Sequence, residues 1–246
     1  VVRGVPGIDC GSRAFADKMN SWAQSQGAPG MGYIIFSDNE AKGPIANALG
    51  LEKVQILKET FNLNDGDALF FSCAMEKEAS DLAGKARTKI AIEKNMIDQT
   101  QFKFCWIVDY PMFEKNEITG EIDFSHNPFS MPQGGMKSLI EKNPLDILAY
   151  QYDLVCNGVE LSSGAIRNHV PEIMYKAFEI AGHNHDVVDN KFPGMINAFK
   201  FGAPPHGGIA PGIDRIVMLL ADEPNLREIV LFPMTGKAED LMMGAP

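Results

Sequence analysis

Apolar residues in the first hundred positions recur at two spacings, one typical of helices and the other of strands. Phe15, Met19 and Trp22 lie three and four residues apart, which indicates one face of a helix, and Ser12 can cap its start. Short apolar runs bounded by glycine-containing turns indicate strands. The predicted helices cover residues 12–26, 44–49, 52–61 and 76–95, and the predicted strands cover 32–36 and 68–73. The pattern predicts a small α+β unit over residues 1–100, without a cluster of catalytic residue types.

A second region starts with a strongly apolar run, residues 102–110, which predicts a strand ended by Pro111. Asn157-Gly158 between β-rich flanks is the strongest short signal for a two-residue hairpin. Further on, an apolar series at helical spacing predicts a helix that begins near residue 209, with Pro211 in its first turn. The series consists of Ile209, Ile213, Ile216, Val217 and Leu220. The remaining predicted elements of this region, 101–246, are a helix at 171–181 and strands at 198–201 and 229–233.

The predicted hairpin carries two carboxylates. A two-residue turn places Val155 opposite Glu160 and Asp153 opposite Ser162. Asp153 and Glu160 then project from the same side of the sheet as diagonal neighbours, about 7–8 Å apart at Cα. Two such carboxylates repel each other unless a cation lies between them, and magnesium carried by a nucleotide suits this arrangement. The simpler alternative is that one or both carboxylates face water.

Two arginines follow at positions that suit anions. Arg215 comes after a loop rich in glycine and proline, near a predicted helix start, where free N–H groups and the helix dipole favour a phosphate. The alternative is an ordinary connection with a solvated arginine. Arg167 can read a carboxylate with its planar guanidinium. Regular alternation puts Arg167 on the face opposite Glu160, and a bulge at residues 162–164 would return it to the same face.

Composition narrows the classes of function. With 45% hydrophobic and 22% charged residues, the 246-residue chain is that of an ordinary globular protein. Its net charge of −10 argues against an autonomous nucleic-acid binder, which would carry a basic face. We expect no membrane span, since no apolar run approaches about 20 residues, and no secretory signal, since residues 1–10 lack a basic start and an apolar block. The four separated cysteines predict reduced, mostly buried thiols in a cytoplasmic protein, and neither a zinc site nor disulfides.

One loop and the helix start after it match a known motif. Gly-Ala-Pro-Pro-His-Gly-Gly at 202–208, followed by Gly-Ile-Asp-Arg at 212–215, resembles the third signature motif of class II aminoacyl-tRNA synthetases. In detail it is similar to the aspartyl-tRNA synthetases of bacterial type. The resemblance implies that Gly212, Ile213, Asp214 and Arg215 contact ATP, with the arginine at the triphosphate.

Two further strings carry the same resemblance. His-Asn-Pro-Phe at 126–129 is similar to the family's His-x-Pro-Phe motif, which implies that His126 lines the aspartate pocket. Residues 160–167 have the length of the family's Glu-x-Gly-Gly-Gly-Ser-x-Arg motif, with serines replacing two glycines and alanine replacing the serine. This match implies that Arg167 binds the substrate aspartate. It also implies that Glu160 contacts ATP and, with Asp153, holds the ATP-bound magnesium.

The resemblance covers nearly the whole chain and implies its domain organisation. Residues 101–246 would be the C-terminal half of the catalytic domain, an incomplete class II antiparallel sheet flanked by helices. Residues 1–100 would be most of a smaller α+β insertion domain, of the kind shared with the amidotransferase B subunit. The family's first motif, which builds the dimer interface, its second motif and its anticodon-binding barrel have no counterpart here. We therefore expect a C-terminal fragment that is inactive, or nearly so, by itself.

The implied reaction joins L-aspartate to tRNA(Asp) through aspartyl-adenylate, using ATP and Mg²⁺. The parent enzyme would be a cytoplasmic homodimer without a membrane association. Two alternatives stay open. An asparaginyl or asparagine-forming relative is one, although Arg167 argues for a substrate that bears a carboxylate. The other is a non-catalytic interaction module that keeps the fold without the chemistry.

Overall fold

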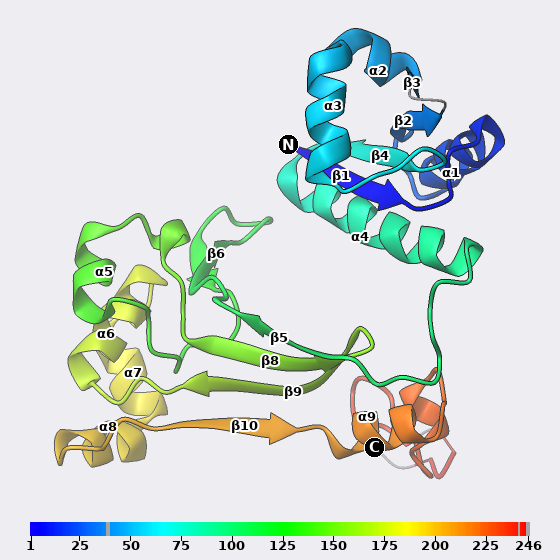
Figure 1. The fold of residues 1–246 in the computed structure, drawn as a ribbon. Helices are drawn as coiled ribbons and strands as arrows, with labels where there is room; N and C mark the ends of the chain where they lie inside the picture. The colour runs from blue at the N-terminus through cyan, green and yellow to red at the C-terminus, as the bar shows by residue number, and fades with distance from the viewer. Residues whose placement is uncertain (38–39, 241, 245–246) are drawn as a thin grey trace. The chain divides into compact units, whose positions relative to one another are not determined.

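The computed structural model describes residues 1–37, 40–240 and 242–244. The chain divides into two compact units, Val1–Gln101 and Phe102–Pro246. Each unit combines antiparallel strands with helices, as Figure 1 shows, which confirms the predicted α+β class. The assignment of the first unit as an insertion domain stays a prediction.

The first unit contains a four-stranded antiparallel sheet in the order β1-β4-β2-β3. Its strands are β1 (Val2–Gly7), β2 (Gly32–Ser37), β3 (Glu40–Lys42) and β4 (Ala68–Cys73). Its helices are α1 (Arg13–Ser25), α2 (Pro44–Leu49), α3 (Leu51–Thr60) and α4 (Glu76–Glu93). The predicted helices and strands of this unit are confirmed with small differences at their ends. The sequence pattern does not predict β1 and β3.

Helices of the first unit cover both faces of its sheet. Successive residues of β4 point to opposite faces, Leu69 to one and Phe70 to the other, and both are fully buried. Phe70 packs with residues of α1 and α4, among them Met19 and Ile90. Leu69 packs with residues of α2 and α3, among them Val54. The core of this unit is therefore closed by its own residues on both sides of the sheet.

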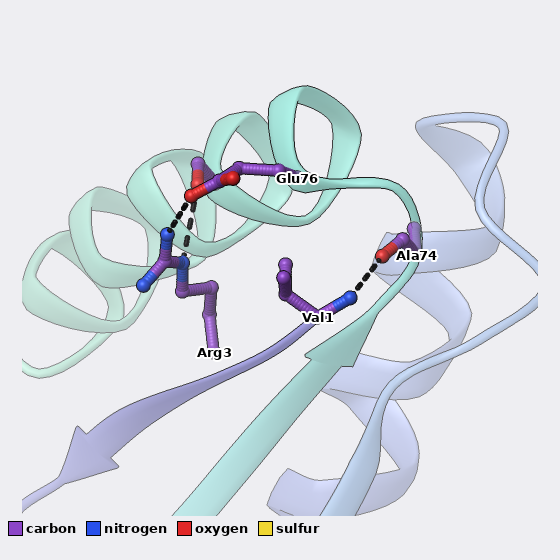
Figure 2. Close-up of polar contacts among 5 residues, drawn as sticks. Val1, Arg3, Ala74 and Glu76 are labelled. Atoms are coloured by element: carbon purple, nitrogen blue, oxygen red, sulfur yellow. Dashed lines mark hydrogen bonds and ion pairs between the residues drawn. The ribbon is translucent and has the colours of Figure 1, made fainter. Parts of the chain in front are cut away.

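Polar contacts join the start of β1 to the start of α4 (Figure 2). The nitrogen of Val1 donates to the carbonyl of Ala74, at 2.8 Å, just after β4. Arg3 donates from Nη2 to Glu76 Oε1 at 2.7 Å and from Nε to Ser80 Oγ at 3.2 Å. Glu76 lies in the first helical turn, where a negative charge is favoured by the helix dipole. These exposed contacts help to fix β1 beside β4.

The second unit contains a four-stranded antiparallel sheet in the order β10-β9-β8-β5. Its strands are β5 (Phe104–Val108), β8 (Gln151–Cys156), β9 (Val159–Ile166) and β10 (Gly207–Pro211), and β6 (Phe113–Lys115) pairs separately with β7 (Ile122–Phe124). Its helices are α5 (Gly135–Glu141), α6 (Pro171–Ile180), α7 (His185–Lys191), α8 (Pro193–Lys200) and α9 (Ile213–Leu220), with short 3₁₀ turns at Pro144–Asp146 and Leu226–Glu228.

Helices α5 to α8 gather at one end of this sheet, and α9 lies at the other end (Figure 1). An aromatic cluster forms the core of the helical end. Phe178 of α6 lies with its ring centroid 4.9 Å from Phe124 and 6.1 Å from both Phe129 and Phe192. The loop after β5 contributes Met112, which is buried. This core fixes the loops that follow β5 and β7 against the sheet.

Three predictions for the C-terminal segment are wrong. Residues 198–201, predicted as a strand, belong to the last part of α8 and the residue after it, because Phe192, Ile196 and Phe199 recur at helical spacing and pack in the core. Ile209 and Pro211, predicted inside a helix, lie in β10 and pair with β9. Proline is tolerated there because β10 is an edge strand.

The third wrong prediction is the strand at residues 229–233. In the described part of the chain no strand pairs with this segment. Leu231 and Phe232 are exposed, so the apolar run from which the strand was predicted does not correspond to a buried segment.

The cysteines differ in part from the expectation. All four are free, as predicted, but only Cys10 and Cys156 are buried, whereas Cys73 and Cys105 are exposed. Burial raises the pKa of the Cys10 thiol to about 11. The helices of the described residues are all too short or too polar to cross a membrane.

Candidate functional site

A cavity of about 650 Å³ opens on one face of the second unit's sheet, beside the loops that follow β5 and β7. Four of the predicted site residues line it: His126, Asp153, Glu160 and Arg167. Strand β10 lines another side. The segment 212–215 is not part of the wall, but Arg215 reaches it through Glu160. The chemical roles given to these residues stay predictions.

The hairpin of β8 and β9 places both carboxylates in the cavity. Glu160 pairs with Val155, as predicted. Asp153 pairs with Ser163, and the predicted pairing with the preceding serine is wrong, because the register shifts by one residue between the two carboxylates. Asp153 and Val155 lie two residues apart in β8 and so point to the same face. Glu160 pairs directly with Val155, and directly paired residues share a face. The two carboxylates therefore share one face, as predicted.

The same register shift brings Arg167 to the cavity. Leu161 is the extra residue of β9, and its buried side chain turns away from the cavity, so the residues after it change face. The bulge predicted at 162–164 therefore exists but lies earlier. Its position is explained by the carbonyl of Leu161, which accepts the N–H of Gly212 at the start of α9, at 2.7 Å. Beyond the bulge, the N–H of Arg167 donates to the carbonyl of His206 at 2.8 Å.

Asp153 is held by a tyrosine. The hydroxyl of Tyr110, in the loop just after β5, donates to Asp153 Oδ2. Burial and the bond to this carboxylate raise the pKa of Tyr110 to about 12. The phenol is therefore protonated at neutral pH and donates its hydrogen to the carboxylate.

Glu160 is held by a cation. Arg215 Nη1 donates to the backbone carbonyl of Glu160 at 2.7 Å and to its Oε1 at 2.9 Å. The side chains of Glu160 and Arg215 are 46% and 43% exposed, so water screens the attraction between them. This ion pair therefore stabilises the structure by about 1 kcal/mol or less. An ion pair this weak can be exchanged for a more highly charged partner.

His126 lies at the wall of the cavity next to the tyrosine. Its ring stands nearly perpendicular to that of Tyr110, at 78°, with the ring centroids 5.0 Å apart. The loop that carries it is anchored by Gln151, a buried residue of β8, whose Nε2 donates to the carbonyl of Asn127 at 3.2 Å. A single side chain, Tyr110, therefore contacts both His126 and Asp153.

Strand β10 lies close to β9 at Gly164. A Cβ at this position would lie 2.4 Å from the carbonyl oxygen of Gly208 and 2.4 Å from Cε2 of Tyr152. The hydroxyl of Tyr152 also donates to that carbonyl, at 3.1 Å. Glycine is required here because of the close approach, and Gly164 is the one of the three motif glycines that this sequence keeps within residues 160–167.

The carboxylate pair suits a divalent cation that arrives with further ligands. The described residues hold no group of three or more His, Cys, Asp or Glu side chains able to bind a metal by themselves. Asp153 and Glu160 supply two carboxylates on one wall. Mg²⁺ is typically bound by one or two carboxylates together with phosphate oxygens and water. The donor set therefore fits magnesium carried by a nucleotide better than a metal centre built from protein alone.

Tyr110 and Gln151 are site residues that the sequence pattern does not reveal. Tyr110 precedes Pro111 at the end of an apolar strand and passes for a strand terminator. Gln151 is the first residue of β8, and no motif marks it. The available signal was the chemistry of Tyr110, since a tyrosine beside an apolar strand usually needs a partner for its hydroxyl.

Comparisons with known proteins bear on the whole chain. The family model described as tRNA synthetases class II (D, K and N) matches residues 40–236. A relative from Zymomonas mobilis subsp. mobilis named aspartate–tRNA(Asp/Asn) ligase is 60% identical over 248 residues, which cover 100% of this chain and 42% of that protein. A relative of the same name from Erythrobacter litoralis is 62% identical over 235 residues, which cover 96% of this chain and 39% of that protein.

The chain thus spans about two fifths of the length of these curated relatives. Among solved structures, an aspartyl-tRNA synthetase from Entamoeba histolytica is 22% identical and has a TM-score of 0.43. The match covers 77% of this chain and 31% of that one. A likeness at this level adds nothing to the assignment.

Proposed function

The chain belongs to the class II tRNA synthetases (D, K and N), and on that premise we propose that it carries the ATP and aspartate site of an aspartate–tRNA ligase. One observation supports this most: side chains from three separate segments meet at one cavity, and Arg215 contacts Glu160 in its wall. The resemblance of the motifs gives these same residues complementary roles at one substrate. The names of the relatives give both tRNA(Asp) and tRNA(Asn) as acceptors, and we propose the same pair for this chain.

The proposed reaction has two steps and needs no nucleophile from the protein. An oxygen of the aspartate α-carboxylate attacks the α-phosphorus of ATP, and the bond to the bridging oxygen breaks, so that pyrophosphate leaves with the electron pair. A ribose hydroxyl at the tRNA 3′ end then attacks the acyl carbon, loses its proton, and releases AMP. Such chemistry depends on positioning and on charge that is offset at phosphorus.

Arg215 and Glu160 would change partners when the nucleotide binds. Arg215 turns from the carboxylate to the triphosphate, which carries more charge, and Glu160 becomes available to the nucleotide. The exposed ion pair between them stabilises the empty site only weakly, so the exchange costs little. Asp153 and Glu160 would hold the magnesium, which when bound offsets negative charge on the phosphates. Gly212, Ile213 and Asp214 form the start of α9 beside this pair and would contact ATP.

Arg167 and His126 would bind the amino acid. The guanidinium of Arg167 suits the side-chain carboxylate of aspartate, which it can bind through two parallel hydrogen bonds. An asparagine amide would leave part of that donor set without an acceptor, which is why an asparaginyl relative is the weaker candidate. His126 borders the same cavity and is held beside Tyr110.

We expect that this chain alone does not activate aspartate at a useful rate. The family's first and second motifs, which build the dimer interface and grip the α-phosphate, have no counterpart in its sequence. The working enzyme would be a cytoplasmic homodimer of the relatives' length that binds tRNA largely through other residues. The net charge of −10 agrees with a chain that does not bind tRNA by itself.

The test is aspartate-dependent exchange of pyrophosphate into ATP, measured in the enzyme at the length of its relatives. Arg215→Ala is expected to lower the exchange rate by about 10²–10³-fold, because one charge-offsetting group is lost at the phosphates. Arg167→Gln is expected to raise KM for aspartate strongly and to leave KM for ATP nearly unchanged. Arg227→Ala, an exposed arginine outside the cavity, serves as the control and should behave as wild type.

Two outcomes would contradict the proposal. Wild-type activity of Arg167→Gln toward aspartate would remove the amino-acid site from this cavity. A lack of heat when ATP and Mg²⁺ are titrated into the wild-type enzyme would favour a non-catalytic interaction module.

A further inference from the structure

We propose that Tyr110 is a positioning residue that joins the two halves of the site, with its hydroxyl acting on the metal-side carboxylate Asp153 and its ring acting on His126. The inference rests on the proposed function and deepens it. It assigns two separable tasks to two parts of one side chain that no motif of the chain includes.

The backbone around Tyr110 is fixed on both sides. Its carbonyl accepts the N–H of Ala149 at 2.8 Å, and the next but one residue, Met112, donates to the carbonyl of Ile147 at 2.8 Å. The residue before it, Asp109, has a left-handed φ of 59° and accepts a bond from Gln133 Nε2 at 2.6 Å. These contacts hold the chain in a sharp turn directly after β5, so the direction in which Tyr110 leaves the backbone is set.

The hydroxyl end of Tyr110 orients Asp153. A neutral donor fixes the rotamer of a carboxylate without offsetting its charge, whereas Arg215 offsets the charge of Glu160. Of the two carboxylates in the wall, Asp153 is thus the one oriented by a neutral hydroxyl, whereas Glu160 is oriented by a cation that also contacts its charge. Groups that orient a ligand to a metal in this way typically change metal affinity when they are removed.

The ring of Tyr110 orients His126. The imidazole lies in an exposed loop. It packs perpendicular to the ring of Tyr110, with the centroids 5.0 Å apart, and the backbone of Tyr110 is itself held in place. Anchoring by Gln151 acts on the neighbouring backbone of Asn127 and leaves the imidazole free to rotate. Loss of the ring should therefore disturb the amino-acid side of the cavity, and loss of the hydroxyl alone should not.

Two variants of the full-length enzyme separate the two tasks. Tyr110→Phe removes the hydroxyl and keeps the ring, whereas Tyr110→Leu removes both. The measurements are the Mg²⁺ concentration at half-maximal pyrophosphate exchange, KM for aspartate, and binding of Mn²⁺ with a non-hydrolysable ATP analogue, followed by electron paramagnetic resonance. The last of these reports the metal site without turnover.

Tyr110→Phe is expected to raise the half-saturating Mg²⁺ concentration and the Mn²⁺ dissociation constant by about tenfold, with KM for aspartate within about twofold of wild type. Saturating Mg²⁺ should restore its exchange rate, which it would not do for a misfolded protein. Tyr110→Leu is expected to raise KM for aspartate as well.

Tyr175 provides a matched control, because it repeats the same chemistry outside the cavity. Its hydroxyl donates to Asp189 Oδ1 at 2.6 Å, and its ring stacks on His185 with centroids 4.5 Å apart. Tyr175→Phe should leave all three measurements at wild-type values.

Three results would overturn the inference. Unchanged Mg²⁺ and Mn²⁺ dependence in Tyr110→Phe would exclude the task of the hydroxyl. An equal rise of KM for aspartate in both variants would exclude the division between hydroxyl and ring. A wild-type enzyme without aspartate-dependent exchange would overturn the proposed function itself and this inference with it, and is distinguished by failing before any substitution is made.

Discussion

The two sheets of this protein bury their apolar strands to very different degrees. In the first unit, Leu69 and Phe70 of the interior strand β4 are fully buried on opposite faces. In the second unit, every residue of β5 is exposed, although its sequence Phe-Cys-Trp-Ile-Val is just as apolar. Strand β10, at the other edge of that sheet, is exposed along its whole length as well.

The difference shows that an apolar run predicts a strand but does not predict its burial. Burial needs a partner layer, and in the first unit helices of the same 101 residues supply it on both faces. In the second unit the described residues place one neighbour, β8, beside β5 and none along its outer edge. The site-bearing sheet is therefore the less self-contained of the two. Long apolar edges of this kind are normally covered or paired in a working protein.

The largest expected effect tests this contrast with one aromatic residue from each sheet. Phe70→Ala should lower the free energy of unfolding of the first unit by about 3–5 kcal/mol, because it leaves a cavity in a closed core. Trp106→Ala in β5 should cost less than about 1.5 kcal/mol, since Trp106 is 58% exposed and its main aromatic contact is an edge-on one with Tyr152. Urea unfolding followed by far-UV circular dichroism measures both. Equal losses would mean that something covers β5 in solution.

A smaller loss of stability is expected from a substitution in the second sheet where β9 and β10 lie close together. Gly164→Ala should destabilise the β9–β10 pair by about 1–3 kcal/mol, because the new methyl group would meet the backbone of β10. Gly208→Ala, on the facing strand, is the matched control, since its added Cβ would meet nothing within 4 Å. The same unfolding assay applies. A neutral Gly164→Ala would show that the two strands separate easily and that this wall of the cavity is loose.

The smallest perturbation is chemical labelling, because each unit has one buried and one exposed cysteine. An aromatic disulfide reagent at pH 8 should react quickly with Cys73 and Cys105 and only after unfolding with Cys10 and Cys156. Cys10 should stay silent to pH 9, since its pKa, raised to about 11 by burial, keeps the thiol protonated throughout that range. Protection of Cys105 in the folded protein would again indicate a cover over β5. Mass spectrometry of the labelled peptides assigns the sites.

The turn of the β8–β9 hairpin can be predicted from neighbouring residues, whereas the register of its strands depends on contacts between distant residues. Asn157 and Gly158 adopt φ values of 50° and 83°, as a two-residue turn requires, so the turn follows from two residues alone. The bulge needed to bring Arg167 to the site face was expected at 162–164 and occurs at Leu161. Its carbonyl bonds to Gly212, a residue 51 positions away in the chain, and no local pattern encodes that contact.

The difference between local and long-range contacts also explains why the helix predicted to begin near residue 209 begins later. Ile209 fits the helical series by spacing. It nevertheless lies in β10, because residues 207–211 pair with the edge of β9 that β8 does not occupy. Pairing with an available strand overrides helical periodicity when the segment is short and rich in glycine and proline. The start of the helix moved only to residue 213, so Arg215 still lies in its first turn and still reaches the hairpin.

The sequence by itself determined the α+β class, the helices of the first unit and its strands β2 and β4, the tight hairpin turn, and four of the side chains that line the cavity. These depend on interactions between residues close in the chain, which a linear pattern records. The tertiary structure alone decided the place of the bulge, the pairing of Arg215 with Glu160, and the contact of Tyr110 with both Asp153 and His126. Each of these joins segments many residues apart, and such contacts are fixed only when the strands and loops pack together.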